Sequence, residues 1–382
     1  MIRRHKIRLY PNDAQATYFS KACGVARFAY NWALSEWKRK YDAGETVKEP
    51  DLRKALNAIK REQFPWMRDV ARCVPQLAIK KDLNNALRDF KKKGTEPPQY
   101  RRKGAHDSFM LANDHFAISG RKVWIQKLGW VKIAEEFRFD GKITDAIISR
   151  RADKWHITVQ TEMAEMAEMP EMPDAGFGHV YRDNALGISF GDGSSIVLSD
   201  GTASGKTESG GQFERKIRRL HQGLSRRQGA RKGESQSANY KSTKGEISRL
   251  YAKIDDIQAD ETHKLTTRLT RQYGLIGIED PGAKGFAHSQ NPTRGAADKC
   301  LSVFRRQLEY KAAATGTRII AAESRFPART LCSICGHTNE GLAPNDREWT
   351  CAACGVRHDS DLNAAINLRN YAIKADRELK TP

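Results

Sequence analysis

Residues 185–198 read ALGISFGDGSSIVL, and this stretch decides the class of fold. Two apolar runs, Ala185–Phe190 and Ser195–Leu198, flank Gly191-Asp192-Gly193, whose residue types favour a turn. Short apolar runs bounded by turn residues are typical of buried strands. The stretch therefore predicts a β-hairpin of two strands.

Helices and further strands follow this hairpin. The polar, basic residues 226–245 are expected to form a loop between two helices. The predicted elements are, in chain order, helices at 213–224 and 247–257, a strand at 275–279, a helix at 304–313 and a strand at 318–322. Strands that alternate with helices in this way predict an α/β fold.

The first 160 residues follow a different pattern. Residues 2–10 alternate basic and apolar side chains, as a strand does, and a helical pattern runs from Asn12 to about residue 93. Several short runs between residues 100 and 160 are rich in β-branched and aromatic residues, which predicts the strands of a small barrel or sheet. Residues 163–173 are acidic and contain Met and Pro, and we expect a linker there.

The composition points to a polyanionic partner. The chain has 382 residues and a formal net charge of +20, with a pI near 9.7 and a mean hydropathy of −0.68. Such an excess of Lys and Arg favours nucleic acid, because each neutralised phosphate releases counterions and adds affinity. The sequence contains no apolar run long enough for a membrane helix and no signal peptide pattern. We therefore expect no membrane partner and a cytoplasmic, nucleoid-associated location.

Four cysteines form two CxxC pairs near the C-terminus. Cys332 and Cys335 are separated by fifteen residues from Cys351 and Cys354. Each CxxC can form a turn that presents two thiolates to one metal, and four thiolates suit a tetrahedral Zn²⁺. Because four thiolates leave no open coordination position, we predict one structural zinc ion.

Several multi-residue motifs, found in the same order along the chain, resemble the TnpB (OrfB) proteins of bacterial insertion sequences. These proteins are compact RNA-guided nucleases related to the type V CRISPR effectors. The closing motif RHDSDLNAAIN departs from the family at Ser360, where Arg is usual. The motifs are Arg8-Leu9-Tyr10-Pro11 with Gln15, then Gly24, Arg27, Tyr30 and Asn31, then Lys127–Trp130, Gln307–Lys311 and Arg357–Asn367.

The resemblance implies a domain organisation. It implies a β-barrel interrupted by a helical recognition lobe, followed by a RuvC-like, RNase H-type domain interrupted by a zinc ribbon. It places the barrel at 1–10 and 100–175 and the helical lobe at 11–99. It places the RuvC-like domain at 176–325 and 358–382, with the zinc ribbon at 326–357.

The resemblance also implies three acidic positions that hold two Mg²⁺ ions for DNA cleavage. Glu279 matches the second position and Asp361 the third. The first falls on Ser189 in Gly187-Ile188-Ser189-Phe190-Gly191, where an Asp is expected. Because serine is neutral and a weak Mg²⁺ ligand, we predict that Mg²⁺ binding is weak or absent and that the nuclease is inactive.

No nearby carboxylate is a good substitute for the missing one. Asp192 is three residues from Ser189, so in a strand it points to the opposite face. Asp183 is six residues away, about 20 Å along an extended strand. Glu279 and Asp361 also have non-catalytic interpretations, as a strand end and as a helix-capping residue.

These observations leave three hypotheses for the function. The first is guide-RNA-directed binding to duplex DNA beside a short adjacent motif, without cleavage, by a monomeric ribonucleoprotein that represses transcription. The second is an active RNA-guided endonuclease of an insertion sequence, and the third is a decayed relic. The candidate nucleic-acid contacts are Arg8, Tyr10, Arg27, Asn31, Arg101, Arg102, Lys103, Arg226, Arg227 and Arg231.

Overall fold

The structure is a computed structural model of the full chain, and it divides into two compact units, Met1–Ala167 and Glu168–Pro382. It describes residues 2–93, 96–162, 184–191, 196–204, 208–226, 237–279, 292–343 and 346–379. The expected linker at 163–173 and the hairpin turn at Asp192-Gly193 lie outside these residues. None of the helices in the described part of the chain is both long and apolar enough to span a bilayer.

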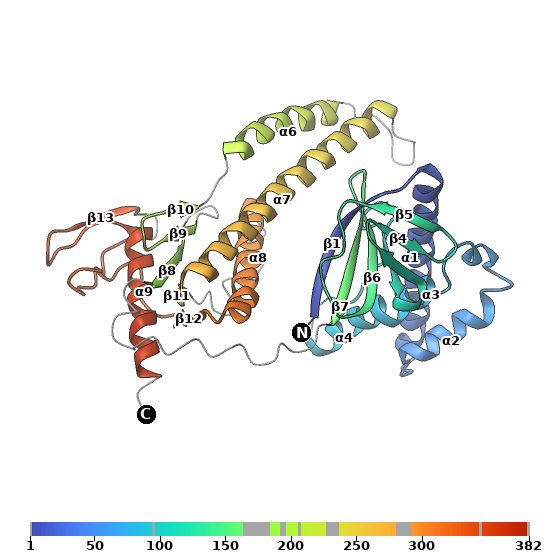
Figure 1. The fold of residues 1–382 in the computed structure, drawn as a ribbon, viewed down its shortest axis with the longest axis horizontal. Helices are drawn as coiled ribbons and strands as arrows, with labels where there is room; N and C mark the ends of the chain where they lie inside the picture. The colour runs from blue at the N-terminus through green and yellow to red at the C-terminus, as the bar shows by residue number, and fades with distance from the viewer. Residues whose placement is uncertain are drawn as a thin grey trace. The chain divides into compact units, whose positions relative to one another are not determined.

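The first unit is built on a seven-stranded antiparallel sheet in the order β2-β6-β7-β1-β5-β4-β3 (Figure 1). The N-terminal strand β1 lies in the middle of this sheet, between β7 and β5. Among the described residues no pairing joins β3 to β2, so a closed barrel is not observed. The strands are β1 (Ile2–Tyr10), β2 (Ser108–Ala112), β3 (Phe116–Ser119), β4 (Lys122–Ile125), β5 (Gly129–Ile133), β6 (Lys142–Arg151) and β7 (Lys154–Glu162).

Helices fill the chain between β1 and β2. They are α1 (Asp13–Asp42), α2 (Glu49–Ile59), η1 (Pro65–Asp69), α3 (Cys73–Leu77), η2 (Ala78–Leu83) and α4 (Asn84–Lys93), and a short turn η3 (Asn113–His115) follows β2. Asn12 begins α1 with a capping box that it shares with Gln15, as the sequence pattern indicates. The helices and the sheet share one core, in which the ring centroids of Phe19 in α1 and Trp155 in β7 are 5.1 Å apart.

The second unit contains a five-stranded mixed sheet in the order β10-β9-β8-β11-β12. Its strands are β8 (Ala185–Phe190), β9 (Ile196–Leu198), β10 (Ala203–Ser204), β11 (Leu275–Glu279) and β12 (Arg318–Ala322). Strands β8 and β9 pair antiparallel, which confirms the predicted hairpin strands, whereas β8, β11 and β12 run parallel. A smaller ribbon pairs β13 (Glu348–Thr350) with β14 (Arg357–Asp359).

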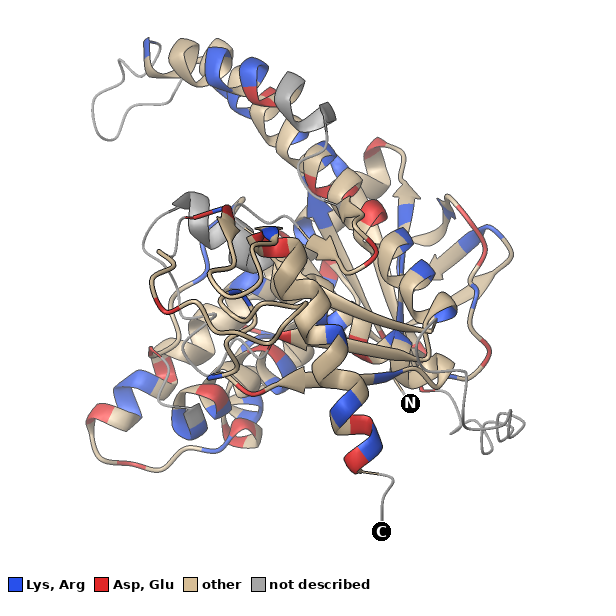
Figure 2. Cartoon of the chain, turned by 90° about the vertical axis from the view of Figure 1, so that its left-hand side faces the viewer, with Lys and Arg blue, Asp and Glu red and all other residues tan. Residues whose placement is uncertain are grey.

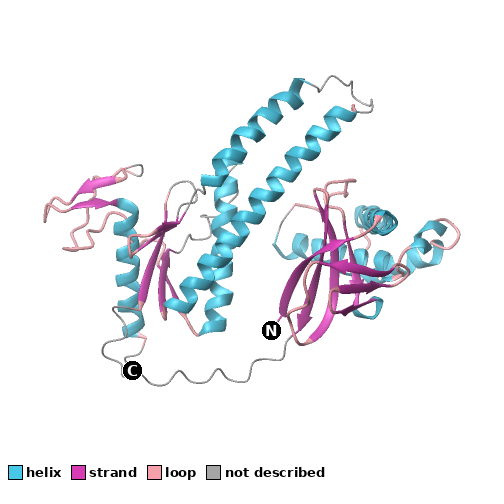
Figure 3. Cartoon of the chain, turned by 45° about the horizontal axis from the view of Figure 1, so that its top comes forward, coloured by secondary structure: helices cyan, strands magenta, loops and turns pink. Residues whose placement is uncertain are grey.

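Four long helices accompany this sheet. They are α6 (Glu208–Arg226), α7 (Ala238–Gln272), α8 (Pro292–Thr315) and α9 (Ser360–Glu378). Apolar side chains of α7 and α8 cover one face of the sheet, and α9 covers the other (Figure 3). Because α7 begins at Ala238, the expectation of a loop throughout 226–245 is wrong for its last eight residues. Among these eight residues only Tyr240 and Thr243 are buried, which is too few for apolar periodicity to indicate a helix.

Two glycines let α9 approach the sheet closely. Gly187 of β8 and Gly277 of β11 are directly paired in the parallel register. A Cβ at Gly187 would lie 1.8 Å from the Ala365 carbonyl oxygen, and a Cβ at Gly277 would lie 2.2 Å from the Leu368 carbonyl oxygen. Any larger residue would therefore push the helix off the sheet.

We expect Gly277→Ala to lower the free energy of unfolding of this unit by about 3 kcal/mol or more, because its methyl group would collide with the α9 backbone. The matched control is Gly245→Ala in α7, where nothing lies within 4 Å of the new Cβ. That change should be neutral or stabilising by up to about 1 kcal/mol. Urea unfolding of both variants measures the difference, and equal stabilities would contradict the close-packing argument.

Candidate functional site

The three positions of the predicted nuclease site meet on the face of the sheet that α9 covers. Side chains alternate along strands, so Ser189 shares a face with Gly187, and Glu279 shares a face with Gly277. Ile188 pairs with Ile278 in the parallel register, so Ser189 and Glu279, the residues that follow them, lie side by side. The Ser189 hydroxyl donates a 3.0 Å hydrogen bond to Glu279 Oε1, and Ser189 is fully buried.

Asp361 reaches the same site from the first turn of α9. Its carboxylate accepts a 2.8 Å hydrogen bond from the Arg329 guanidinium. The N-terminus of α9 is capped by Asp359, whose side chain accepts from the backbone N–H groups of Asp361 and Leu362. The interpretation of Asp361 as the capping residue is therefore wrong, whereas Glu279 does end a strand.

Burial and the neighbouring charges together set the protonation of Glu279. Burial raises the pKa of Glu279, and the nearby Asp361 raises it further. The hydrogen bond from Ser189 and the positive charge of Arg329 act in the opposite direction. Burial has the largest effect, so the protonated form of Glu279 is favoured more than in water.

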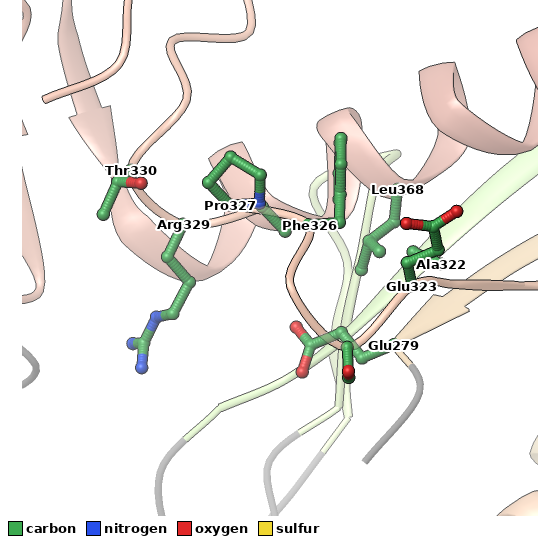
Figure 4. A pocket seen from close by; sticks show the side chains of 10 residues that line it. Glu279, Ala322, Glu323, Phe326, Pro327, Arg329, Thr330 and Leu368 are labelled. Carbon is green, nitrogen blue, oxygen red and sulfur yellow. The ribbon is translucent and has the colours of Figure 1, made fainter. Parts of the chain in front are cut away.

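A cavity of about 250 Å³ opens beside Glu279 and Arg329. Its wall continues through the segment after β12, which includes Glu323, Phe326 and Pro327. Figure 4 shows that the carboxylates of Glu279 and Glu323 point in different directions. Glu323 is exposed and does not join the group formed by Ser189 and Glu279.

The described residues do not fit the pair of Mg²⁺ ions that the family resemblance implies. Ser189 offers a neutral hydroxyl whose proton is already donated to Glu279. One oxygen of Asp361 is already bound by Arg329. Two Mg²⁺ ions repel each other, and a bridging carboxylate normally offsets that repulsion. The alternative carboxylates Asp183 and Asp192 lie outside the described residues.

Arg329 is the residue of this site that the sequence did not single out. It lies three residues before the first cysteine of the CxxC pairs, among 66 Lys and Arg residues in the chain. No spacing rule distinguishes it from the other cations. Only the fold brings its guanidinium to Asp361 and Glu279.

The four predicted metal ligands form a compact cluster. The sulfur atoms of Cys332, Cys335, Cys351 and Cys354 all lie within 4.8 Å of one another, so the group can hold a metal ion such as zinc. Cys332 and Cys351 are buried, and Cys335 and Cys354 are exposed. The arrangement confirms that the two CxxC pairs converge on one point.

The two turns of this cluster have the same backbone geometry. Gly336 and Gly355 have φ angles of 74° and 72°, a left-handed conformation that favours glycine. Their N–H groups donate to the carbonyls of Cys332 and Cys351 at 3.0 and 2.8 Å. A hydrogen bond from the Cys354 backbone lowers the pKa of Cys351 to about 6, whereas burial and the neighbouring thiols raise the pKa values of Cys335 and Cys354. The first thiolate of the cluster therefore forms at Cys351.

His358 supports the cluster from β14. Its Nε2 lies 3.1 Å from the Cys332 sulfur, and its ring packs against Trp349 at 4.7 Å. Burial lowers the pKa of His358, which favours the neutral ring. A neutral ring can donate one N–H to a sulfur ligand, as residues next to metal ligands often do.

The predicted nucleic-acid contacts fall into separate groups. Arg8 lies over the exposed ring of Tyr10 at 4.9 Å on β1. The Asn31 side-chain amide donates to the Arg101 carbonyl and accepts from the Arg101 backbone N–H, and the Arg101 guanidinium pairs with Asp82 at 2.8 Å. These two residues therefore stabilise the helical part of the first unit, whatever else they contact.

The remaining candidates are more dispersed. Arg27 lies 3.6 Å from Asp107, and Arg102 and Lys103 are exposed in the segment before β2. Arg226 ends α6, which with α7 carries many of the Lys and Arg residues visible in Figure 2. Arg227 and Arg231 lie outside the described residues. Contact of these residues with nucleic acid stays a prediction.

Two family descriptions match the chain. "Cas12f1-like, TNB domain" matches residues 302–368, which contain α9's first turns and the four cysteines. "Helix-turn-helix domain", from the OrfB proteins of IS605 elements, matches residues 1–46. In this structure that range holds β1 and the single long helix α1.

Relatives cover almost the whole chain. A "Putative RNA-guided DNA endonuclease" of Streptomyces pristinaespiralis is 29% identical over 96% of this chain and 88% of its own length. A protein of Escherichia coli K12 with the same description is 25% identical over 96% of this chain and 91% of its own length. The solved Cas12f1–sgRNA–target DNA complex is 12% identical, covers 97% of this chain and 99% of its own, and has a TM-score of 0.35, too low to support a fold argument.

The fold and site define an α/β protein with a buried polar site at the strand ends and a four-cysteine group that can hold a metal. In both matched segments and in its relatives, the chain is similar to the TnpB/IS605 OrfB family.

We expect Glu279→Gln to stabilise the protein by on the order of 1 kcal/mol at pH 7, because it removes a buried carboxylate while keeping the oxygen that accepts from Ser189. The carboxyl group of Glu279 binds its proton more tightly in the folded state than in the unfolded state. The free energy of unfolding of the wild type should therefore fall as pH rises from about 4.5 through the raised pKa of Glu279. Unfolding measured at several pH values should show a flatter dependence in the variant. Glu323→Gln is the control, and an equal effect there would contradict the assignment.

Proposed function

We propose that this chain is an RNA-guided protein that binds duplex DNA without cleaving it and thereby represses transcription. The names of its relatives support the RNA-guided part, and the net charge of +20 supports a polyanionic partner. Bound protein that leaves the target intact obstructs the polymerase. Base pairing with the guide reads the sequence, while the protein reads a short adjacent motif and the backbone.

The hydrogen bond between Ser189 and Glu279 is the main support for the proposal that the protein does not cleave DNA. A neutral hydroxyl stands beside the Glu, and Arg329 supplies a positive charge to Asp361. The cation beside these acids is thus an arginine, which cannot bind and activate a water molecule as a hydroxide nucleophile in the way a metal does. Ser189, Glu279 and Asp361 are, on this proposal, the vestiges of a metal site.

We assign the finer architecture in the same way. Residues 1–10 and 100–175 form the barrel-like domain, and 11–99 form the helical recognition lobe. Residues 176–325 and 358–382 form the RuvC-like domain, and 326–357 form the zinc ribbon. The mixed sheet with α9 on one face and α7 and α8 on the other supports the third assignment.

The zinc assignment predicts about one Zn²⁺ per chain in protein purified without chelator. Four thiolates, one of them with a lowered pKa, favour zinc over Mg²⁺ or Ca²⁺. Elemental analysis by mass spectrometry measures the ratio. Cys351→Ser should lose the metal and lower the melting temperature, whereas Cys73→Ser, which changes a buried cysteine far along the chain, should keep it. Zinc below a few tenths per chain in the wild type would rule out the assignment.

The cleavage prediction uses the RNA that co-purifies with the protein, sequenced to define a matched target duplex. The wild type should bind this duplex and leave it uncut in Mg²⁺ or Mn²⁺. Ser189→Asp alone should stay inactive, since Arg329 still occupies Asp361. Ser189→Asp with Arg329→Ala should bind Mn²⁺ measurably by calorimetry, because it adds one carboxylate and removes the competing cation.

The matched control for this experiment is Ser189→Asp with Arg325→Ala, which removes an exposed arginine of the same segment. It should bind no more Mn²⁺ than Ser189→Asp alone. Metal-dependent cleavage by the wild type that disappears in Glu279→Ala would overturn the proposal and favour the active endonuclease. A co-purified RNA that matches a promoter favours repression, and one that matches an empty insertion site favours the transposon nuclease.

A further inference from the structure

The backbone between Arg329 and Cys332 connects two sites of the second unit. Arg329 binds Asp361 of the candidate nuclease site, and Cys332 belongs to the four-cysteine cluster. Arg329 lies three residues before Cys332, which corresponds to at most about 10 Å of extended chain. A displacement at the cluster therefore reaches Arg329 if this short segment is rigid.

The side chain of Asn363, near the start of α9, holds this segment on both sides of the first cysteine. Its amide oxygen accepts a 3.0 Å hydrogen bond from the backbone N–H of Ser333. Its amide nitrogen donates to three carbonyls, those of Leu331 at 2.8 Å, Arg329 at 3.3 Å and Ala328 at 3.4 Å. One side chain thus spans residues 328–333, from just before the arginine to the interior of the CxxC turn.

The hydrogen bonds of Asn363 lie away from water, which makes them costly to break. Asn363 is 1% exposed, and Ala328 is also buried. A buried polar group that loses its partner has no water to replace it. An amide has two N–H groups, and the carbonyls of this segment accept from both. Residues 328–333 are therefore fixed to α9 as one rigid piece.

Cys332 links this rigid piece to the other metal ligands. Its sulfur is buried, and Nε2 of His358, two residues before α9, lies 3.1 Å from it. Bonds of about 2.3 Å to a zinc ion fix the position of each sulfur ligand. Metal binding therefore orders the turn that carries Ser333, and with it the hydrogen bond from Ser333 to Asn363.

We propose that Asn363 is a positioning residue that couples metal binding at the four-cysteine cluster to the contact between Arg329 and Asp361. The arginine is held on the acid more firmly when the cluster contains a metal ion. Coupling of this kind is reciprocal, so loss of the contact between Arg329 and Asp361 weakens metal binding by the same factor. The inference rests on the zinc assignment and is independent of nucleic-acid binding.

Asn367, one turn further along α9, provides a matched comparison. It is also buried, with 3% of its surface exposed. Its amide donates to the carbonyls of Leu331 and Ala328 at 2.6 and 2.9 Å, and among the described residues it bonds neither Arg329 nor Ser333. Asn367→Ala therefore removes a buried amide from the same segment but leaves the link between the arginine and the CxxC turn.

The zinc affinity of the full chain, measured by competition with a chromophoric chelator, tests the coupling. Arg329→Ala and Asp361→Ala should each weaken zinc binding roughly fivefold or more, although neither residue is a ligand. Both changes break the same contact, so both act in the same direction. If charge alone mattered, removal of a cation and removal of an anion would have opposite effects. Arg325→Ala, which removes an exposed arginine of the same segment, should leave the affinity unchanged.

Asn363→Ala should abolish the coupling. In that background Arg329→Ala should change the zinc affinity by less than about twofold. In the Asn367→Ala background the roughly fivefold effect of Arg329→Ala should persist. Circular dichroism and melting temperature establish that each variant is folded.

Three results would contradict the inference. Zinc affinity that is unchanged in Arg329→Ala, or that moves in opposite directions in Arg329→Ala and Asp361→Ala, would overturn the coupling, and this comparison does not require the Asn363 variant to fold. Equal loss of the coupling in both asparagine backgrounds would assign it to the packing of α9 and overturn the role of Asn363. Either result leaves the zinc assignment intact, whereas a wild type that binds no zinc would overturn both.

Discussion

The contact between α9 and the two central strands of the second unit is the constraint on which the candidate site depends. Gly187 and Gly277 leave no space for a side chain between the sheet and the helix backbone. This close approach brings the first turn of α9 to the ends of β8 and β11. Ser189, Glu279 and Asp361, which are far apart in the sequence, therefore share one small volume. The position of the site is fixed by backbone packing, independently of which chemistry its side chains perform.

Protein groups supply the positive charge and the hydrogen bond that contact the two acids of this site. A group of acids buried together needs a cation, since unpaired carboxylates are costly away from water. Here Arg329 provides that charge to Asp361, and Ser189 provides a hydrogen bond to Glu279. Burial still raises the pKa of Glu279, so these protein groups offset only part of the cost of its charge.

Charged residues are arranged differently on the exposed face of the first unit's sheet. Where helices meet the sheet, ions are paired, as in the contact between Lys81 of η2 and the buried Asp145 of β6. On the face of β1, β5 and β4, Lys122 and Lys132 stand opposite each other without an acid between them. Internal pairing stabilises a fold, whereas cations left unpaired at the surface favour association with a polyanion. Paired ions such as Lys81 and Asp145 therefore stabilise the fold, whereas Lys122 and Lys132 are available to a partner.

The sequence by itself predicted several strands and helices and the convergence of the four cysteines, because both depend on local patterns. Apolar runs and turn residues predicted β8, β11 and β12, and CxxC spacing predicted the convergence of four sulfurs. It also identified Ser189 as the unusual residue, since a motif has a fixed register. Only the tertiary structure decided that Arg329 pairs with Asp361, that Asp359 caps α9, and that Tyr10 shares a face with Lys132 and Lys122. These contacts join residues on different elements, and their geometry follows from strand register and helix packing, which no local pattern encodes.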